Sequence, residues 1–259
     1  MDAENSKIFN DWRVAVVSLR GTHHKNADMP CQDSSYWRIP IPGILVAAVT
    51  DGAGSARLAE VGANIASRVA VEHACQQLLN ARDYTVNTIT RFLTESVTAA
   101  RSALELEARS RNTNIGELAC TLILLIASRT ILAVAQIGDG AVVLRKIDGS
   151  MATLTLPVRG EYFNETVFLT SRNALDLINL KVSDFPITHI ASFTDGIEML
   201  ALTMPDSLPY LPFFTPLFSM LSEAPTIDEA NSRLRSLFLS SGIHGKTNDD
   251  ITLLMATLT

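Results

Sequence analysis

The chain has 259 residues, of which 47% are hydrophobic and 19% charged, and its formal net charge is −6. These proportions suit a folded protein with a sizeable core and exclude an intrinsically disordered chain. The acidic balance argues against a general nucleic-acid binder, which carries a basic excess. The three cysteines, Cys31, Cys75 and Cys120, lie far apart without metal-ligand spacing. They indicate neither a disulfide framework nor a zinc site, so we expect a cytoplasmic protein.

Neither a secretory signal nor a membrane span is expected. The first twelve residues carry no basic segment followed by an apolar core. The most apolar stretch, residues 118–137, is about as long as a membrane helix, but Ser128, Arg129 and Thr130 divide it into two short halves. Two buried strands joined by a turn explain this stretch better.

The first half of the chain is predicted to form strands and then two helices. Residues 13–19 and 44–49 are short, apolar or β-branched segments that run into glycine-containing turns, which is typical of strands. Over 58–79 and 89–104, apolar residues recur every three or four positions, which predicts amphipathic helices. We expect these two consecutive helices to pack side by side on one face of a sheet.

From residue 118 the apolar pattern changes to that of strands. Four short segments follow one another at 118–127, 131–137, 141–147 and 151–156. Between the last two lies Asp148-Gly149, which is a strong signal for a two-residue hairpin turn. We expect the four segments to form one antiparallel meander.

The last third of the chain mixes strands and helix. Further strands are expected at 166–170, 189–193 and 251–257. Residues 205–216 carry four prolines and indicate a loop or broken helix, whereas 227–239 has helical spacing. This order of elements indicates an α+β layered fold rather than a regular βαβ alternation. No repeat or linker divides the chain, so we expect a single domain over residues 1–259.

Five aspartates lie at the ends of predicted strands, each beside glycine or another turn-forming residue: Asp33, Asp51, Asp139, Asp195 and Asp249. Carboxylates at strand ends emerge at one edge of a sheet. Mg²⁺ and Mn²⁺ prefer carboxylate, carbonyl and water oxygens, so converging aspartates would make a site for them. The four carboxylates other than Asp139 would balance the charge of two divalent ions, and Asp139 would help to hold a third.

The alternative is that these residues only form turns, since an Asp-Gly pair after a strand is first of all a turn signal. Asp148-Gly149 illustrates this, because it lies in a plain hairpin and we assign it no chemistry. For Asp139 the same alternative, a tight turn between two strands, stays open. The other four aspartates are distinguished by their order along the chain and by the residues around them.

Seven short motifs occur in a characteristic order: Gly21-Thr22-His23-His24, Pro30-Cys31-Gln32-Asp33, Asp51-Gly52-Ala53-Gly54-Ser55, Ala119-Cys120-Thr121-Leu122, Gly138-Asp139-Gly140, Thr194-Asp195-Gly196 and Asn248-Asp249-Asp250-Ile251-Thr252. Together they resemble the motifs of the metal-dependent protein phosphatases of type 2C. The resemblance spans about residues 13–257. The two opening motifs and residues 160–166 are most similar to the divergent bacterial branch of that family.

The resemblance implies a four-layer α/β/β/α sandwich of two antiparallel sheets flanked by helix pairs. It also implies two Mn²⁺ or Mg²⁺ ions in a cleft at one end. In this family pattern Asp51 would bridge the two ions, and Asp195 and Asp249 would complete the first. The Gly52 carbonyl would help to hold the second ion, and Asp33 would reach a metal through water.

Further positions concern the third metal and the departures from the family pattern. Asp139 matches the aspartate that supports a third, weaker metal position in bacterial relatives. Gln32 stands where the family has a glutamate, and its neutral side chain would weaken the second ion. The arginine that grips the substrate phosphate is not evident, and His24 stands nearest to its place. Ala53 replaces a histidine proposed as general acid, which leaves protonation of the leaving group to His24 or water.

The function implied by the resemblance is hydrolysis of phosphoserine and phosphothreonine in proteins, by in-line attack of a hydroxide that bridges the metals. Asp51, Asp195 and His24 would form the catalytic centre, and the segment 158–183 would form a flap beside it. A serine/threonine kinase is an implied partner, and a von Willebrand A-type protein a further associate.

Two alternatives stay open at this point. One is a catalytically weak relative that binds a phosphoprotein as a regulator, which Gln32 and the missing arginine motivate. Retention of Asp51, Asp195 and Asp249 argues against it, because a binding module has no need of a costly carboxylate cluster. The other is a hydrolase of small phosphate esters that uses the same metal site and differs only in substrate.

Overall fold

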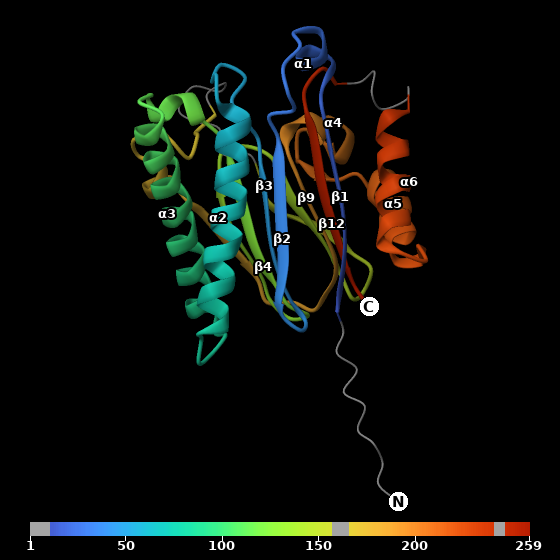
Figure 1. The fold of residues 1–259 in the computed structure, drawn as a ribbon. Coiled ribbons are helices and arrows are strands. Elements are labelled where there is room, and N and C mark those ends of the chain that lie inside the picture. The colour runs from blue at the N-terminus through green and yellow to red at the C-terminus, as the bar shows by residue number, and fades with distance from the viewer. Residues whose placement is uncertain (1–10, 157–165, 241–246) are drawn as a thin grey trace, which may run out of the picture.

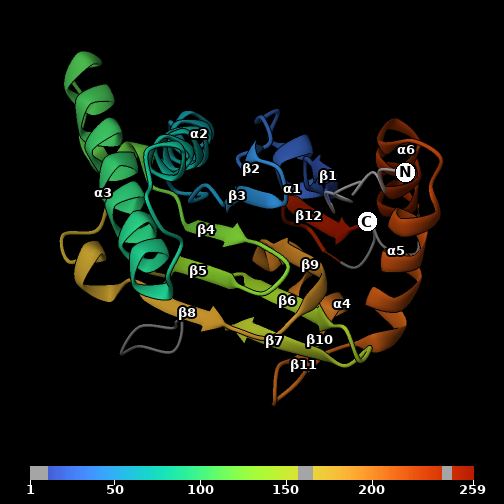
Figure 2. The same cartoon turned by 90° about the horizontal axis from the view of Figure 1, so that it is seen from below.

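Two five-stranded antiparallel sheets lie face to face, and a pair of long helices covers the outer face of each sheet (Figure 1). This arrangement comes from a computed structural model, which describes residues 11–156, 166–240 and 247–259. The predicted α+β fold, a four-layer sandwich flanked by helix pairs, is therefore confirmed. Figure 2 shows the same layers from below, with α2 and α3 on one side and α5 and α6 on the other.

The first sheet has the order β2-β3-β4-β5-β8. It is covered by α2 (Ala59–Leu79) and α3 (Val86–Ser110), which also pack against each other. Its strands are β2 (Ser34–Ile41), β3 (Ile44–Thr50), β4 (Leu122–Ala127), β5 (Leu132–Ile137) and β8 (Asn179–Ser183).

The second sheet has the order β1-β12-β9-β6-β7 and is covered by α5 (Leu211–Glu223) and α6 (Ile227–Leu239). Its strands are β1 (Trp12–Leu19), β12 (Ile251–Leu258), β9 (Ile187–Phe193), β6 (Ala141–Lys146) and β7 (Met151–Thr155). The smaller elements are α1 (Thr22–Asn26), α4 (Glu198–Ala201), the β10–β11 hairpin (Leu202–Thr203 and Leu208–Pro209) and 3-10 turns at Ile115–Leu118, Ala174–Leu177 and Asp195–Ile197.

Strand β3 shows why this chain forms a sandwich. Val46 and Ala48 pack in the core under α2 and α3, whereas Leu45, Ala47 and Val49 pack in the core between the two sheets. Successive side chains of a strand point to opposite faces, so a strand covered on both sides needs apolar residues throughout. Burial of these two faces, and of the corresponding core under α5 and α6, is the main force that holds the layers together.

The predicted meander over residues 118–156 is wrong. β4 pairs with β5, and β6 pairs with β7 through the predicted hairpin at Asp148-Gly149, but β5 and β6 lie in different sheets. The short loop 138–140 therefore carries the chain from one sheet to the other. A glycine-rich turn between two apolar strands looks the same in sequence whether the strands pair or part.

Several other predicted elements differ in the structure. Residues 166–170 form none of the strands, since a turn begins at residue 169, and α5 begins inside the proline-rich stretch at Leu211. Strands β2 and β8 were not predicted. The proposed flap 158–183 begins outside the described residues, as does most of the family-like segment 160–166, and its last residues form β8. In the described part of the chain, none of the helices has the length and apolarity to cross a membrane.

Candidate metal centre

A cavity of about 480 Å³ opens at one end of the sandwich, where strands of both sheets begin or end. Four aspartates line it. Asp51 directly follows β3, Asp195 stands two residues after the end of β9, and Asp249 stands two residues before β12. Asp139 comes from the loop that crosses between the sheets. Residues far apart in sequence thus meet because they occupy the same end of adjoining strands.

Three of these carboxylates form a compact group. One carboxylate oxygen from each of Asp51, Asp139 and Asp195 lies within 4.8 Å of the other two. Asp249 lines the same cavity and is exposed. Carboxylates at this spacing can share one cation, which is the arrangement that the strand-end pattern predicted.

The charges of this group raise the carboxyl pKa values. Burial raises the pKa of Asp51 well above its usual range, and the charges of Asp33 and Asp195 raise it further. Burial, followed by the charge of Asp139, raises the pKa of Asp195 to about 6. Close carboxylates in a partly buried site repel one another, and a bound cation removes that repulsion.

Backbone hydrogen bonds fix the position of Asp51. The Thr121 N–H donates to the Asp51 carbonyl at 2.8 Å, and the Asp51 N–H donates to Thr121 Oγ1 at 2.9 Å. The next residue, Gly52, pairs with Cys120 in an isolated bridge. These contacts continue the β3–β4 pairing past the end of the sheet and hold Asp51 and the Gly52 backbone at the cavity wall.

The crossing loop that carries Asp139 is held from inside the sheet. The fully buried Gln136 donates from Nε2 to the carbonyls of Gly138 and Gly140, at 3.1 and 3.0 Å. From the opposite side, Thr166 Oγ1 donates to Asp139 Oδ2 at 2.7 Å. The loop is therefore fixed at both of its glycines and at its carboxylate.

Gln32 and Asp33 lie behind the cavity rather than in its lining. Gln32 is 3% exposed and Asp33 is 8% exposed. Thr194 Oγ1 donates to Asp33 Oδ2 at 2.8 Å, while burial raises the pKa of Asp33 well above its usual range. Asp33 is therefore a buried carboxylate that does not line the cavity and whose charge raises the pKa of Asp51.

Several buried side-chain oxygens accept no hydrogen bond from the described residues. Among them are Gln32 Oε1, Asp33 Oδ1 and Asp195 Oδ1. Buried polar atoms are almost always partnered, so unpartnered oxygens beside clustered carboxylates indicate that a cation belongs among them. Carboxylate and carbonyl oxygens suit Mn²⁺ and Mg²⁺, and these residues therefore fit such ions.

His24 also lines the cavity. It lies in the short helix α1 and is 5% exposed. Its Nδ1 lies 2.9 Å from Oδ2 of Asp250, a residue for which no role was predicted. Ala53 lines the same cavity, so a short apolar side chain occupies the position at which the family resemblance placed a histidine.

The residues that the sequence missed are mostly hydroxyl and carboxylate partners of the predicted aspartates. Thr121, Thr166 and Thr194 hold Asp51, Asp139 and Asp33 in the ways described above. All three threonines lie next to a motif aspartate or in a family-like segment, which was the available signal. For Thr166 that signal does not identify its partner, because Asp139 lies 27 residues away.

Fold and site together define a four-layer sandwich protein with an oxygen-rich divalent-metal centre at one end. A family model described as protein phosphatase 2C matches residues 20–238. The chain is 35% identical over 254 residues to serine/threonine-protein phosphatase 3 of Escherichia coli (strain K12), an alignment that covers 95% of this chain and 98% of that protein. The chain belongs to the protein phosphatase 2C family, and the resemblance seen in the sequence is confirmed.

Solved structures share the fold at low sequence identity. The serine/threonine phosphatase Stp1 from Staphylococcus aureus matches with a TM-score of 0.65 at 12% identity and covers 100% of both chains. The catalytic domain of the serine/threonine protein phosphatase PstP, in complex with two manganese ions, matches with a TM-score of 0.61 at 18% identity and covers 96% of this chain and 98% of that one. At these identities the matches support the fold.

Proposed function

We propose that this protein is a divalent-metal-dependent phosphatase that hydrolyses phosphoserine and phosphothreonine in proteins. The observation that carries the proposal is the group of Asp51, Asp139 and Asp195, whose ligand oxygens lie within 4.8 Å of one another in the 480 Å³ cavity. Membership of the protein phosphatase 2C family supports the reaction, and the 35% identical relative carries the name of a serine/threonine-protein phosphatase.

Each cavity residue has a role in this proposal. Asp51, Asp195 and Asp249 would hold one ion, Asp51 and the Gly52 carbonyl would hold a second, and Asp139 would support a third position. Mn²⁺ or Mg²⁺ bound here would neutralise the phosphoryl oxygens and lower the pKa of an attacking water.

The residues behind the cavity support these ligands. Asp33 adds negative charge near Asp51, as the raised pKa of Asp51 reflects. Gln32 offers an amide oxygen that has no hydrogen-bond partner among the described residues. An amide oxygen can bind a hard cation but carries no charge, so the second ion is held more weakly than by a carboxylate.

The proposal extends to partners and location. A phosphoprotein substrate requires a serine/threonine kinase, which we propose as the functional partner, and the family resemblance adds a von Willebrand A-type protein as an associate. Three unpaired cysteines accord with a reducing compartment, so we place the protein in the cytoplasm. The segment 158–183 is proposed as a flap that selects the phosphoprotein, and the whole chain as one domain.

The test is hydrolysis of a phosphothreonine peptide and of 4-nitrophenyl phosphate with Mn²⁺, with Mg²⁺ and with a chelator. Metal-dependent release of phosphate is expected from the unaltered protein, and Asp51→Asn and Asp195→Asn should each reduce it by about 100-fold or more. Asp148→Asn is the matched control, because Asp148 lies in the exposed β6–β7 turn and should leave the rate unchanged. Full activity in both site variants would refute the proposal, and activity confined to the aryl phosphate would favour a small-ester hydrolase.

A further inference from the structure

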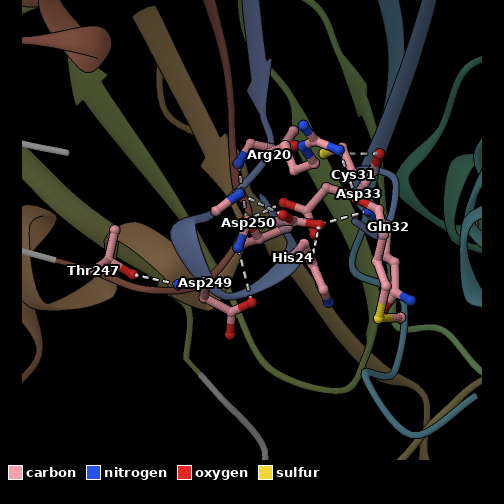
Figure 3. Close-up of polar contacts among 12 residues, drawn as sticks. Arg20, His24, Cys31, Gln32, Asp33, Thr247, Asp249 and Asp250 are labelled. Atoms are coloured by element: carbon pink, nitrogen blue, oxygen red, sulfur yellow. Dashed lines mark hydrogen bonds and ion pairs between the residues drawn. The ribbon is translucent and has the colours of Figure 1, made fainter. Parts of the chain in front are cut away.

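Asp249 and Asp250 are neighbours in sequence, but their side chains lie in different surroundings. Asp249 lines the cavity, whereas Asp250 is 2% exposed and lies outside the lining. Figure 3 shows the two carboxylates turned away from each other, with Asp250 beside His24 and the backbone of Gln32. A buried carboxylate that does not face the cavity needs its own partners, and those partners show what it does.

The partners of Asp250 all come from the segment 21–32. The Gly21 N–H donates to Oδ1 at 2.6 Å, and the Gln32 N–H donates to Oδ2 at 2.5 Å. His24 Nδ1 lies 2.9 Å from the same Oδ2. The two atoms are within ion-pair distance, but their geometry is not that of a hydrogen bond. Two backbone N–H groups suit an ionised carboxylate, so Asp250 presents a negative charge to one nitrogen of the His24 ring.

This contact determines which ring nitrogen the cavity meets. Nδ1 is turned toward Asp250, and the ring is part of the cavity wall, so Nε2 is the nitrogen available to a ligand there. Nε2 has no hydrogen-bond partner within the described parts of the chain. A carboxylate beside one nitrogen of an imidazole sets its tautomer and its orientation for the other nitrogen.

We propose that Asp250 is a positioning residue that holds His24 with Nε2 directed at the ester oxygen of the substrate. This inference rests on the proposed phosphatase function and deepens it. The oxygen of water forms a bond to phosphorus, and the bond between phosphorus and the ester oxygen breaks. The ester oxygen takes the electron pair together with the Nε2 proton of the His24 imidazolium, which becomes the neutral ring with its remaining proton on Nδ1 toward Asp250. His24 then regains a proton from solvent, which balances the one that the attacking water releases.

The chemistry of the leaving group gives a specific test. Serine and threonine leave as alkoxides, which need a proton, whereas 4-nitrophenolate is stable without one. Asp250→Asn should therefore lower kcat for a phosphothreonine peptide tenfold or more and change kcat for 4-nitrophenyl phosphate by less than about threefold. His24→Gln should give the same pattern, and the double variant should lose no more than either single variant, because the two residues act as one unit.

A matched control distinguishes a role of Asp250 in positioning His24 from a role in holding the two loops together. Thr22 Oγ1 donates to Asn248 Oδ1 at 3.0 Å and joins the same two loops without touching His24. Thr22→Ala should leave kcat for both substrates within about twofold. A substrate-selective loss in Thr22→Ala, or equal losses on both substrates in Asp250→Asn, would overturn the proposal.

A readout without turnover completes the test. The ring nitrogen chemical shifts of His24, measured by NMR, report which nitrogen carries the proton. The reacting form carries protons on both nitrogens, and we expect the ring of the unaltered protein to lose the Nε2 proton and keep the Nδ1 proton toward Asp250 when it becomes neutral. This preference for the Nδ1–H tautomer should be lost in Asp250→Asn, and a neutral Nε2–H tautomer in the unaltered protein would overturn the inference even if Asp250→Asn fails to fold. An unaltered protein that hydrolyses neither substrate would refute the phosphatase proposal and with it the catalytic role, while the NMR result would still decide whether Asp250 orients His24.

Discussion

Strand β6 carries an Asp-Gly turn at each end, and the two turns have opposite characters. At one end, Asp139 lies among other carboxylates, and its loop links the two sheets. At the other end, Asp148 closes the β6–β7 hairpin, and its carboxylate accepts hydrogen bonds from the N–H and hydroxyl of Ser150, at 2.8 and 2.6 Å. The aspartate of an Asp-Gly turn is hydrogen-bonded within its own turn where the flanking strands pair. Where the flanking strands enter different sheets, the aspartate lines the cavity.

The electrostatics follow the same division. The Ser150 hydroxyl and N–H lower the pKa of Asp148, which is fully exposed. At the cavity end, burial and neighbouring carboxylates raise the pKa of Asp195 to about 6. One end of the strand thus stabilises an isolated charge, and the other gathers charges that destabilise one another. This contrast explains why only the cavity end is a candidate for chemistry.

The largest expected effect comes from adding a side chain at each turn. Both Gly140 and Gly149 have positive φ, at 91° and 87°, so each alanine is strained. A Cβ on Gly140 would also lie 2.6 Å from the carbonyl of Phe193, whereas on Gly149 its nearest neighbour is Arg145 Nη2 at 3.8 Å. We expect Gly140→Ala to lower the free energy of unfolding by about 3 kcal/mol or more and Gly149→Ala by about 1 kcal/mol. Urea unfolding measures both, and equal losses would contradict the contrast.

Next in size is removal of one negative charge from each turn. Asp139→Asn should lower activity or metal affinity by about 10- to 100-fold, because it alters a group that supports the metal site. Asp148→Asn should leave kcat and the metal requirement unchanged. Metal titrations of activity on 4-nitrophenyl phosphate give both values. If Asp139→Asn behaves like Asp148→Asn, the crossing loop is only a turn.

A smaller effect concerns pH and the metal-free protein. The Asp195 carboxyl binds its proton more tightly when folded, with a pKa of about 6 against the ordinary 3.8, so its contribution to stability is lost as pH rises through about 6. Asp195→Asn should therefore stabilise the chelator-treated protein at pH 7.5 by an amount on the order of 1 kcal/mol, with less effect near pH 4.

Asp148 should respond with the opposite sign. Its pKa is lowered, so its small contribution is present above the ordinary pKa and is lost as pH falls. Asp148→Asn should then slightly lower Tm at pH 7.5 and have no effect at the acid end. Thermal unfolding with chelator across this pH range checks both variants, and a destabilising Asp195→Asn at pH 7.5 would show that repulsion is not the controlling effect.

The smallest effect sharpens the contrast by adding charge to the cavity end. Gln32→Glu should lower the Mn²⁺ concentration for half activity a few-fold, because a carboxylate holds a hard cation more strongly than an amide. The buried Gln32 Oε1 has no hydrogen-bond partner among the described residues, so the site can take a charged oxygen when metal is present. An unchanged Mn²⁺ requirement would refute the account of Gln32 as a weak ligand.

The sequence predicted the layers well because, along most helices and strands, the spacing of apolar residues matches the residues that are buried. Helix α6 has the predicted bounds of residues 227–239, and β3 differs from its prediction by one residue. Helix α5 was missed because its prolines indicate a break. In the structure Pro212 lies in the first turn, where a missing N–H is harmless, and buried Phe214 and Phe218 anchor the helix despite Pro216.

Site residues could be predicted where the neighbouring residues in the sequence mark them. Each motif aspartate stands beside a turn former at a strand end, so its place at a sheet edge could be inferred. Asp250 carries the same local signal as Asp249, yet its role depends on N–H groups 218 and 229 residues away. The meander failed for a similar reason, since only long-range pairing decides that β5 and β6 belong to different sheets.

The cavity lies across the seam between the two sheets. Asp51 follows a strand of one sheet, Asp195 and Asp249 lie beside the ends of strands of the other, and the loop with Asp139 connects the two sheets. An ion held by these carboxylates would therefore link the two sheets, in addition to the apolar core that lies between the sheets. Because the ion would bind only when both sheets are folded together, metal binding should raise the free energy of unfolding of the whole domain.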